Sequence, residues 1–156
     1  MRFFLLLSSC LAFFSTTPLQ ADILNQVVCT MGSGGDGRVI PMAAAPFGMV
    51  ELGPDTYFSG SGYHYNHTAT YGFSHTHKSG GGGTDFQDIL FLPLTGNKWS
   101  NIDQLPSQIT SNFSHTDEIA QPGYYRLLLK DFSINAELTA TSRCGMVNKV
   151  KFLSRL

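Results

Sequence analysis

The chain has 156 residues, 42% of them hydrophobic, and a mean hydropathy of −0.01, which supplies a core for one domain and excludes a fully disordered chain. Only 13% of the residues are charged, the net charge is −1 and no basic run is present, which excludes nucleic acid as the expected partner. Low charge with many Gly, Ser, Thr, Asn and Tyr residues favours a neutral polar ligand.

The first 21 residues have the organisation of a secretory signal peptide. Arg2 is the positive n-region, residues 3–14 form an apolar stretch, and Ala21 ends the expected cleavage site. Because the apolar stretch is too short for a membrane span, we expect an exported protein, periplasmic or extracellular. A loose lipoprotein motif at Leu7-Ser8-Ser9-Cys10 makes lipid anchoring the less favoured alternative. The mature chain would be residues 22–156.

Two cysteines, Cys29 and Cys144, lie outside the signal peptide. Export permits a disulfide between them. A single pair so far apart in the chain is weak evidence for one, so we favour two unpaired, buried thiols.

Apolar and β-branched stretches predict strands in the first half of the chain, at residues 24–31, 47–52 and 88–94. Gly53-Pro54 predicts a turn after the second of these. The third is a continuous apolar run, typical of a strand buried on both faces. The loop of residues 32–37 is rich in glycine but lacks the Lys-Ser/Thr ending of a phosphate-binding loop, which argues against a nucleotide.

The second half has the pattern of a meander. Residues 109–115 are strand-like, residues 117–120 form a short connection with room for one helical turn, and Pro122-Gly123 precedes a strand at 124–129. Apolar residues at every second position predict a half-buried strand over residues 134–140, and residues 146–153 can pair with it after a turn at Cys144-Gly145. No helical stripe is sustained, so we predict a mostly antiparallel, all-β fold of the sandwich type.

The most informative stretch is residues 61–85, which holds four of the five histidines, several interleaved tyrosines and the run Gly80-Gly81-Gly82-Gly83. Bare backbone, flat rings and directional hydrogen-bonding groups suit a sugar. Two alternatives stay open. The histidines could bond only to loop backbone, or His75 and His77 could share one face of a strand and bind zinc or copper with His64 and Asp85.

Carboxylates do not identify an acid–base pair. Glycoside hydrolysis usually needs two, and the informative half of the chain contains Asp36, Glu51, Asp55, Asp85 and Asp88. Their spacing selects no pair, and Asp55 is expected in a turn. Ser74 and Ser79 lie near histidines, but no GxSxG elbow is present.

A series of motifs in one order carries a family resemblance. They are Gly32-Ser33-Gly34-Gly35, Ala45-Pro46-Phe47-Gly48-Met49-Val50, Pro54-Asp55-Thr56, Ser61-Gly62-Tyr63-His64-Tyr65, Gly72-Phe73-Ser74-His75-Thr76-His77, Ser79-Gly80, Asp88-Ile89-Leu90, Pro93-Leu94-Thr95-Gly96, Phe113-Ser114-His115, Ala120-Gln121-Pro122-Gly123-Tyr124-Tyr125 and Glu137-Leu138-Thr139-Ala140-Thr141. Over residues 24–152 the chain resembles glycoside hydrolase family 92, the exo-acting α-mannosidases.

The resemblance implies an N-terminal, supersandwich-like β-sandwich followed by a helical barrel domain, in calcium-dependent enzymes that invert the anomeric carbon. Because the acid, the base and most calcium ligands of the family lie in the barrel, we assign no catalytic or metal-binding residue here. Residues 22–156 would be a partial sandwich, incomplete at the C-terminus and inactive alone. The implied partners are α-mannose-containing glycans and a barrel domain, in cis or from another chain.

By the same resemblance, the candidate substrate-binding residues are Gly34, Gly35, Ser61, Tyr63, His64, His75 and His77. Many relatives carry a tryptophan just before the SGYHY motif, where this chain has Tyr57-Phe58-Ser59-Gly60, so the preferred linkage is not predicted. A non-catalytic carbohydrate-binding module is the alternative function, and a secreted, histidine-rich metal binder a further one.

Overall fold

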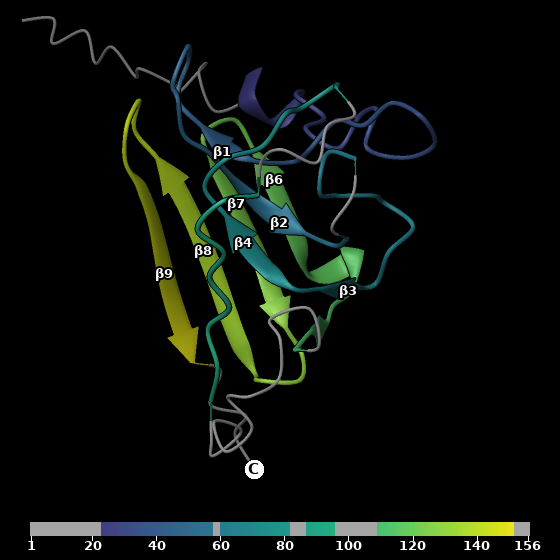
Figure 1. Cartoon of the computed structure of the whole chain (residues 1–156), viewed down its shortest axis with the longest axis vertical. Coiled ribbons are helices and arrows are strands. Elements are labelled where there is room, and N and C mark those ends of the chain that lie inside the picture. Colours follow the sequence, from purple (N-terminus) through teal and green to yellow (C-terminus); the bar gives the residue numbers. More distant parts are fainter. Residues whose placement is uncertain (1–22, 58–59, 82–86, 96–108, 152–156) are drawn as a thin grey trace, which may run out of the picture.

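The computed structural model describes residues 23–57, 60–81, 87–95 and 109–151, and the regular elements among them are almost all antiparallel strands (Figure 1). The largest sheet has the order β6-β7-β8-β9. Its strands are β6 (Glu118–Gln121), β7 (Tyr124–Leu129), β8 (Ile134–Ala140) and β9 (Gly145–Lys151). The predicted all-β, antiparallel fold is therefore confirmed.

The meander follows directly from the sequence pattern. Gly123, with a φ of 75°, makes the turn between β6 and β7. Alternate residues are buried along β7 and β8, and the register pairs Leu127 with Ala136 and Tyr125 with Leu138. The buried side chains of neighbouring strands thus lie on one face of the sheet.

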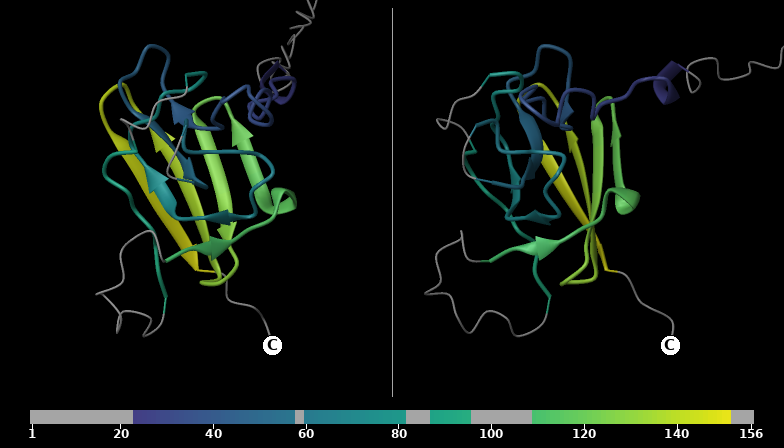
Figure 2. Two further views of the ribbon diagram at one scale, coloured as in Figure 1. Left: turned by 45° about the vertical axis from the view of Figure 1, so that its right-hand side comes forward. Right: turned by 90° about the vertical axis from the view of Figure 1, so that its right-hand side faces the viewer.

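A second layer covers that face (Figure 2). It contains β1 (Ala43–Ala44), β2 (Glu51–Asp55) and β4 (Gly72–Ser74) in the order β1-β2-β4. β1 and β2 contact β8, and β1 also contacts β7. A two-stranded pair, β3 (Ala69–Thr70) with β5 (Ser111–Asn112), and a 3-10 turn, η3 (His115–Asp117), complete the described elements.

The hydrophobic core lies between the two layers. Leu52 of β2 and Phe73 of β4 pack with Tyr125, Leu127 and Leu138 of the meander, and all five are fully buried. Burial of one such side chain stabilises the fold by about 1.5–3 kcal/mol.

The predicted strand at residues 47–52 and the turn at Gly53-Pro54 are shifted in the structure, because Pro54 lies inside β2 opposite Phe73. A proline has no N–H for a sheet ladder. Phe73 exchanges its two backbone hydrogen bonds with Phe91 instead, at 2.8 and 2.9 Å, so this position of β2 needs no donor.

The strand predicted at residues 24–31 is wrong. Residues 23–25 are helical and turns follow, with Gln26 N–H donating to the Ile23 carbonyl and Met31 N–H to the Val28 carbonyl. The large apolar residues here stand at positions 23, 24, 27, 28 and 31, which is a helical spacing, and they are exposed.

The strand predicted at residues 88–94, buried on both faces, is also wrong. Among the described residues it forms a single isolated bridge, between Phe91 and Phe73, and Asp88 accepts one further backbone hydrogen bond from His75. Gln87 and Ile89 have positive φ angles of 78° and 58°, which interrupts an extended chain. Ile89 and Phe91 are exposed, and Phe91 is joined to β4 through Phe73.

The connections of the second half differ in detail from the expectation. The strand predicted over residues 109–115 is reduced to β5. The connection predicted at residues 117–120 is wrong, because residues 118–121 form β6, and the helical turn, η3, lies before them at residues 115–117. Cys29 and Cys144 are both free, as predicted, but Cys29 is only half-buried and Cys144 is exposed, so their predicted burial is wrong. Burial raises the pKa of the Cys29 thiol.

No helix among the described residues is long and apolar enough to cross a membrane. The apolar stretch at residues 3–14 and the expected cleavage site lie outside the described part of the chain.

Candidate functional site

The structure places the seven predicted pocket residues in three settings. Gly34, Gly35 and His64 are exposed or half-exposed, in two loops. Ser61, Tyr63 and His77 are buried. His75 is half-exposed beside Phe91, in a different environment.

Backbone hydrogen bonds join the two loops. The N–H of Tyr65 donates to the Ser33 carbonyl at 2.9 Å, which ties the loop of residues 61–67 to the glycine loop of residues 32–37. The N–H of His64 donates to the Thr56 hydroxyl at 2.9 Å. The loop containing His64 is thus attached at two consecutive residues.

Gly62 is required where the loop passes over the buried polar groups. Its φ is 97°, which side chains rarely adopt. A Cβ atom there would lie 2.8 Å from the side-chain nitrogen of Gln87 and 2.9 Å from Asp55 Oδ1. The glycine therefore permits the close approach that encloses the Asp55 carboxylate.

His64 and His67 form an imidazole pair in this loop, with ring centroids 5.3 Å apart. The Asn66 N–H donates to His64 Nδ1 at 3.2 Å, so in the neutral ring the proton lies on Nε2 and is available to a ligand. His67 Nδ1 lies 3.1 Å from the Thr56 hydroxyl. Desolvation, followed by the neighbouring His64, lowers the pKa of His67, which favours the neutral ring.

Both ring nitrogens of His77 are occupied. Nδ1 donates to the Glu51 carbonyl at 2.7 Å, because a carbonyl can only accept. Nε2 lies 3.0 Å from Asp55 Oδ1 and 3.1 Å from Ser74 Oγ. Because the serine and the aspartate share one nitrogen, the three residues lack the relay of a Ser-His-Asp triad. His77 instead connects β2 to the segment after β4.

Asp55 is therefore a buried hub and not the turn residue that the sequence predicted. The carboxylate is fully buried, and besides His77 it accepts a hydrogen bond from the Gln87 side chain at 2.9 Å. Its Oδ2 atom and the Ser61 hydroxyl are buried without a partner among the described residues. The partners of Asp55 lie 22 and 32 residues away, which the local pattern does not reveal.

A second buried carboxylate, Glu118 at the start of β6, accepts three side chains. The Tyr63 hydroxyl donates to both of its oxygens, at 3.0 and 3.2 Å, and the Tyr125 hydroxyl donates at 2.8 Å. His115 Nδ1 contacts the other oxygen. Burial, and then the Glu118 charge, raise the pKa values of Tyr63 and Tyr125 far above the ordinary range, so both phenols stay neutral.

His75 and His77 do not share a face, contrary to the expectation. β4 ends at Ser74, so strand alternation does not extend through them. His75 packs edge-on against Phe91 with centroids 5.4 Å apart, and its Nδ1 lies 3.4 Å from the Ile89 carbonyl. Over the described residues no group of three His, Cys, Asp or Glu side chains is placed to hold a metal ion, and Asp85 lies outside them.

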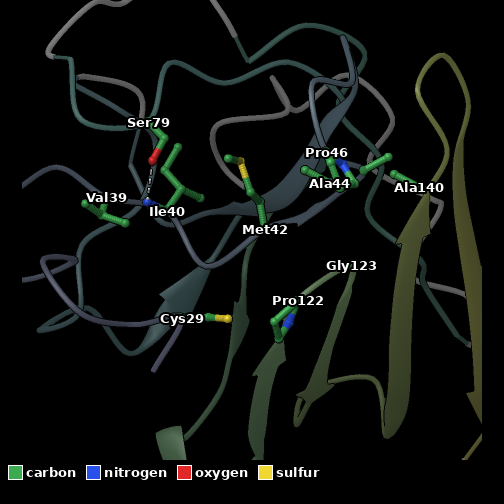
Figure 3. Close-up of a pocket in the computed structure, with 11 residues that line it drawn as sticks. Cys29, Val39, Ile40, Met42, Ala44, Pro46, Ser79, Pro122, Gly123 and Ala140 are labelled. Carbon is green, nitrogen blue, oxygen red and sulfur yellow. Dashed lines mark hydrogen bonds between the residues drawn. The ribbon is translucent and has the colours of Figure 1, made fainter. Parts of the chain in front are cut away.

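Two hollows are formed by described residues, and none of the seven predicted residues lines either. One, of about 290 Å³, is bounded by residues 27–30, Tyr65, His115 and Glu118. The other, of about 690 Å³, is largely apolar and runs from Ile40 and Ser79 to Pro122 and Ala140 (Figure 3). The predicted residues thus lie outside both of these hollows.

A model described as the glycosyl hydrolase family 92 N-terminal domain matches residues 26–150. The chain belongs to glycosyl hydrolase family 92. The solved α-mannosidase BT3965 of Bacteroides thetaiotaomicron, also determined with mannoimidazole, is 38% identical, with a TM-score of 0.72. The family 92 hydrolase ccman5 is 28% identical, with a TM-score of 0.67.

The match covers 81% of this chain but only 18% of BT3965 and of ccman5, so the chain spans less than a fifth of these relatives. The inverting mannosidase BT2199 of Bacteroides thetaiotaomicron, 22% identical with a TM-score of 0.55, shares the fold over 79% of this chain. No curated protein matches. The chain thus matches the N-terminal domain of family 92 enzymes, and the family predicted from the sequence motifs is confirmed.

Proposed function

We propose that this chain acts as the N-terminal domain of an exported exo-α-mannosidase, which removes terminal α-mannose residues with inversion. The observation that carries the proposal is the 38% identity to an α-mannosidase over 81% of the chain. Export through the signal peptide, to the periplasm or the cell exterior, is part of the proposal, and so is the need for a helical catalytic domain.

The proposed contribution of this chain is one wall of the mannoside pocket. Gly34, Gly35 and His64 would face the ligand, because they are the exposed members of the predicted set. An imidazole Nε2–H can donate to a sugar hydroxyl, and bare glycine backbone allows a ring to approach closely. Ser61, Tyr63 and His77 would support this wall from below, since their side chains are buried.

The wall would not hydrolyse mannosides by itself. Two buried carboxylates near it accept hydrogen bonds from side chains, Asp55 from His77 and Gln87, and Glu118 from two tyrosines and a histidine. Inverting hydrolysis needs an acid and a base about 6.5–9.5 Å apart on either side of the scissile bond. We assign both to the catalytic domain.

Calcium, which the family resemblance implies, has no fitting set of ligands among the residues that the structure describes. Calcium prefers six to eight oxygen ligands, and the two buried carboxylates here are bonded to donor side chains. We therefore propose no calcium-dependent step for this chain.

A chimera tests the proposal. Residues 26–150 replace the matching segment of the α-mannosidase BT3965, and the product is assayed on α-mannosides with calcium. We expect a folded chimera that releases mannose, whereas the 156-residue chain alone releases none. A well-folded chimera without activity contradicts the proposal, and so does turnover by the isolated chain after stringent purification.

A non-catalytic carbohydrate-binding module is the second candidate. One observation favours it: hydrogen bonds to Ser33, Thr56 and Glu118 attach the loop of residues 61–67 to the domain itself. Calorimetric titration of the whole chain with mannobiose separates the two, because half of a severed pocket should produce no heat of binding. Saturable heat that is lost in His64→Ala would establish the binding module.

A further inference from the structure

We propose that the buried carboxylate of Glu118 is a positioning group that holds the loop of residues 61–67 from two sides, through Tyr63 and through His115 with Tyr65. It goes beyond the proposed pocket, because Glu118 is not among the proposed pocket residues and would act on them through other side chains. If the loop faces a mannoside, which rests on the proposed function, then Glu118 also sets the affinity of that face.

The first attachment is through Tyr63. Its ring is fully buried, and its hydroxyl donates to both oxygens of a carboxylate 55 residues away in the chain. Hydrogen bonds to an ionised group are about twice as strong as those between neutral groups. Tyr63 is flanked by Gly62 and His64, so this bond anchors the middle of the SGYHY motif to the meander.

The second attachment is through His115. Its Nδ1 contacts Glu118 Oε2, and its ring stacks on Tyr65 with centroids 4.1 Å apart and an interplanar angle of 13°. Phe113 packs edge-on against the same imidazole at 5.3 Å. Tyr65 is therefore backed by a ring whose own position depends on the carboxylate.

The two attachments bracket His64. Tyr63 lies before it and Tyr65 after it, and both lead to the same carboxylate, whose side chain is only 3% exposed. A carboxylate offers about four acceptor sites. The Tyr125 hydroxyl donates to Oε1, His115 Nδ1 contacts Oε2 and the Tyr63 hydroxyl approaches both, so each oxygen of Glu118 is engaged by side chains of the domain.

Tyr125 provides a matched control within the same cluster. Its hydroxyl donates to Glu118 just as that of Tyr63 does, but Tyr125 lies in β7 and carries no part of the loop. Tyr63→Phe and Tyr125→Phe each remove one hydroxyl that donates to the same carboxylate, shared between both oxygens for Tyr63 and directed to Oε1 for Tyr125. Only the first should release the loop if Glu118 positions it.

The test is amide hydrogen exchange, followed by NMR on the full 156-residue chain without ligand. The reporters are the amides of His64, Tyr65 and His67, which are bonded to Thr56 Oγ1, the Ser33 carbonyl and the His64 carbonyl. In Tyr63→Phe we expect these amides to exchange about tenfold faster, while the amides of β7 and β8 keep their rates. Tyr125→Phe should leave the three reporters within about twofold of the wild type.

Equal effects of the two variants on the reporters would overturn the proposal, as would unchanged reporters in Tyr63→Phe or a rise shared by all amides. Glu118→Gln keeps the side-chain size and should accelerate the same three amides. In the Glu118→Gln background, Tyr63→Phe should accelerate exchange of these amides little further. Fully additive accelerations would contradict the role of the shared carboxylate.

A second arm measures the consequence in the BT3965 chimera, where Tyr63→Phe should raise KM more than Tyr125→Phe does. An inactive wild-type chimera would count against the proposed function only, because the exchange measurement judges the role of Glu118 without any ligand.

Discussion

The two layers of this domain are held together in different ways. The meander β6–β9 is regular, and its buried residues alternate along β7 and β8. The layer of β1, β2 and β4 has strands of two to five residues, and buried polar side chains join it to the surrounding loops. Apolar packing therefore builds the scaffold, whereas long-range hydrogen bonds to the carboxylates of Asp55 and Glu118 shape the candidate pocket wall.

The largest effect is expected from a substitution in the apolar core between the two layers. Leu127→Ala in β7 should reduce the free energy of unfolding by about 2–5 kcal/mol, because Leu127 is fully buried between the layers. Urea unfolding measures the change. Lys130→Ala is the control: its ion pair with Asp117, at 3.5 Å, is exposed and should contribute less than about 1 kcal/mol. Similar losses in both variants would contradict a packing origin.

The next largest effect is expected from a substitution in the buried hydrogen bonds. Asp55→Asn should cost about 1–3 kcal/mol of unfolding free energy, since a buried acceptor of two side chains is exchanged for a group that also donates. Asp131→Asn is matched to it, because Asp131 also accepts two N–H groups, both from Asn112, but is exposed. If the exposed variant lost as much stability as the buried one, burial would not be the cause.

Alkaline pH should act through the Glu118 cluster. The pKa values of Tyr63 and Tyr125 are raised in the fold above the ordinary value of 10, so the folded state retains protons that the unfolded state loses. Their stabilising contribution is complete below pH 10 and is lost as the pH rises beyond it. Absorbance at 295 nm should report ionisation of these two phenols only together with loss of the β-sheet circular dichroism. Their ionisation in a folded protein would contradict the buried cluster.

The smallest effect is expected at Glu51, through the pH dependence of stability. Burial raises the pKa of this carboxyl above its ordinary value of 4.5, and its Oε2 atom is buried without a partner among the described residues. A raised pKa means that stability falls as the pH rises from 4.5 through the folded-state value. Glu51→Gln should therefore remove this fall, and thermal unfolding between pH 4 and 7 measures it. A variant with the wild-type slope would contradict the assignment.

The meander was predictable because its information is local. The period of two over residues 134–140 and the Pro122-Gly123 turn determine β7, β8 and their pairing with little help from the rest of the chain. The same reasoning failed at residues 24–31 and 88–94, where apolar residues are exposed in turns and in an outer segment. An apolar run shows where a chain prefers to be covered, but not whether another layer covers it.

The candidate wall was only partly predictable. Its histidines and glycines stand together in the sequence, but Glu118 lies 55 residues from Tyr63, in a segment that the sequence predicts as a connection. Asp55 follows Gly53-Pro54, and this local pattern predicts a turn. Partners of a buried carboxylate become visible only when the strands are in place, because the constraint is spatial.

The central claim is that the loop of residues 61–67 faces the mannoside while the meander supports it. The most direct measurement is kcat/KM of the BT3965 chimera carrying His64→Ala, with Lys130→Ala as control. The account predicts a fall of about tenfold or more for the histidine variant, with an unchanged melting temperature, because a neutral hydrogen bond to the sugar is lost. An unchanged kcat/KM in a folded His64→Ala chimera would contradict it.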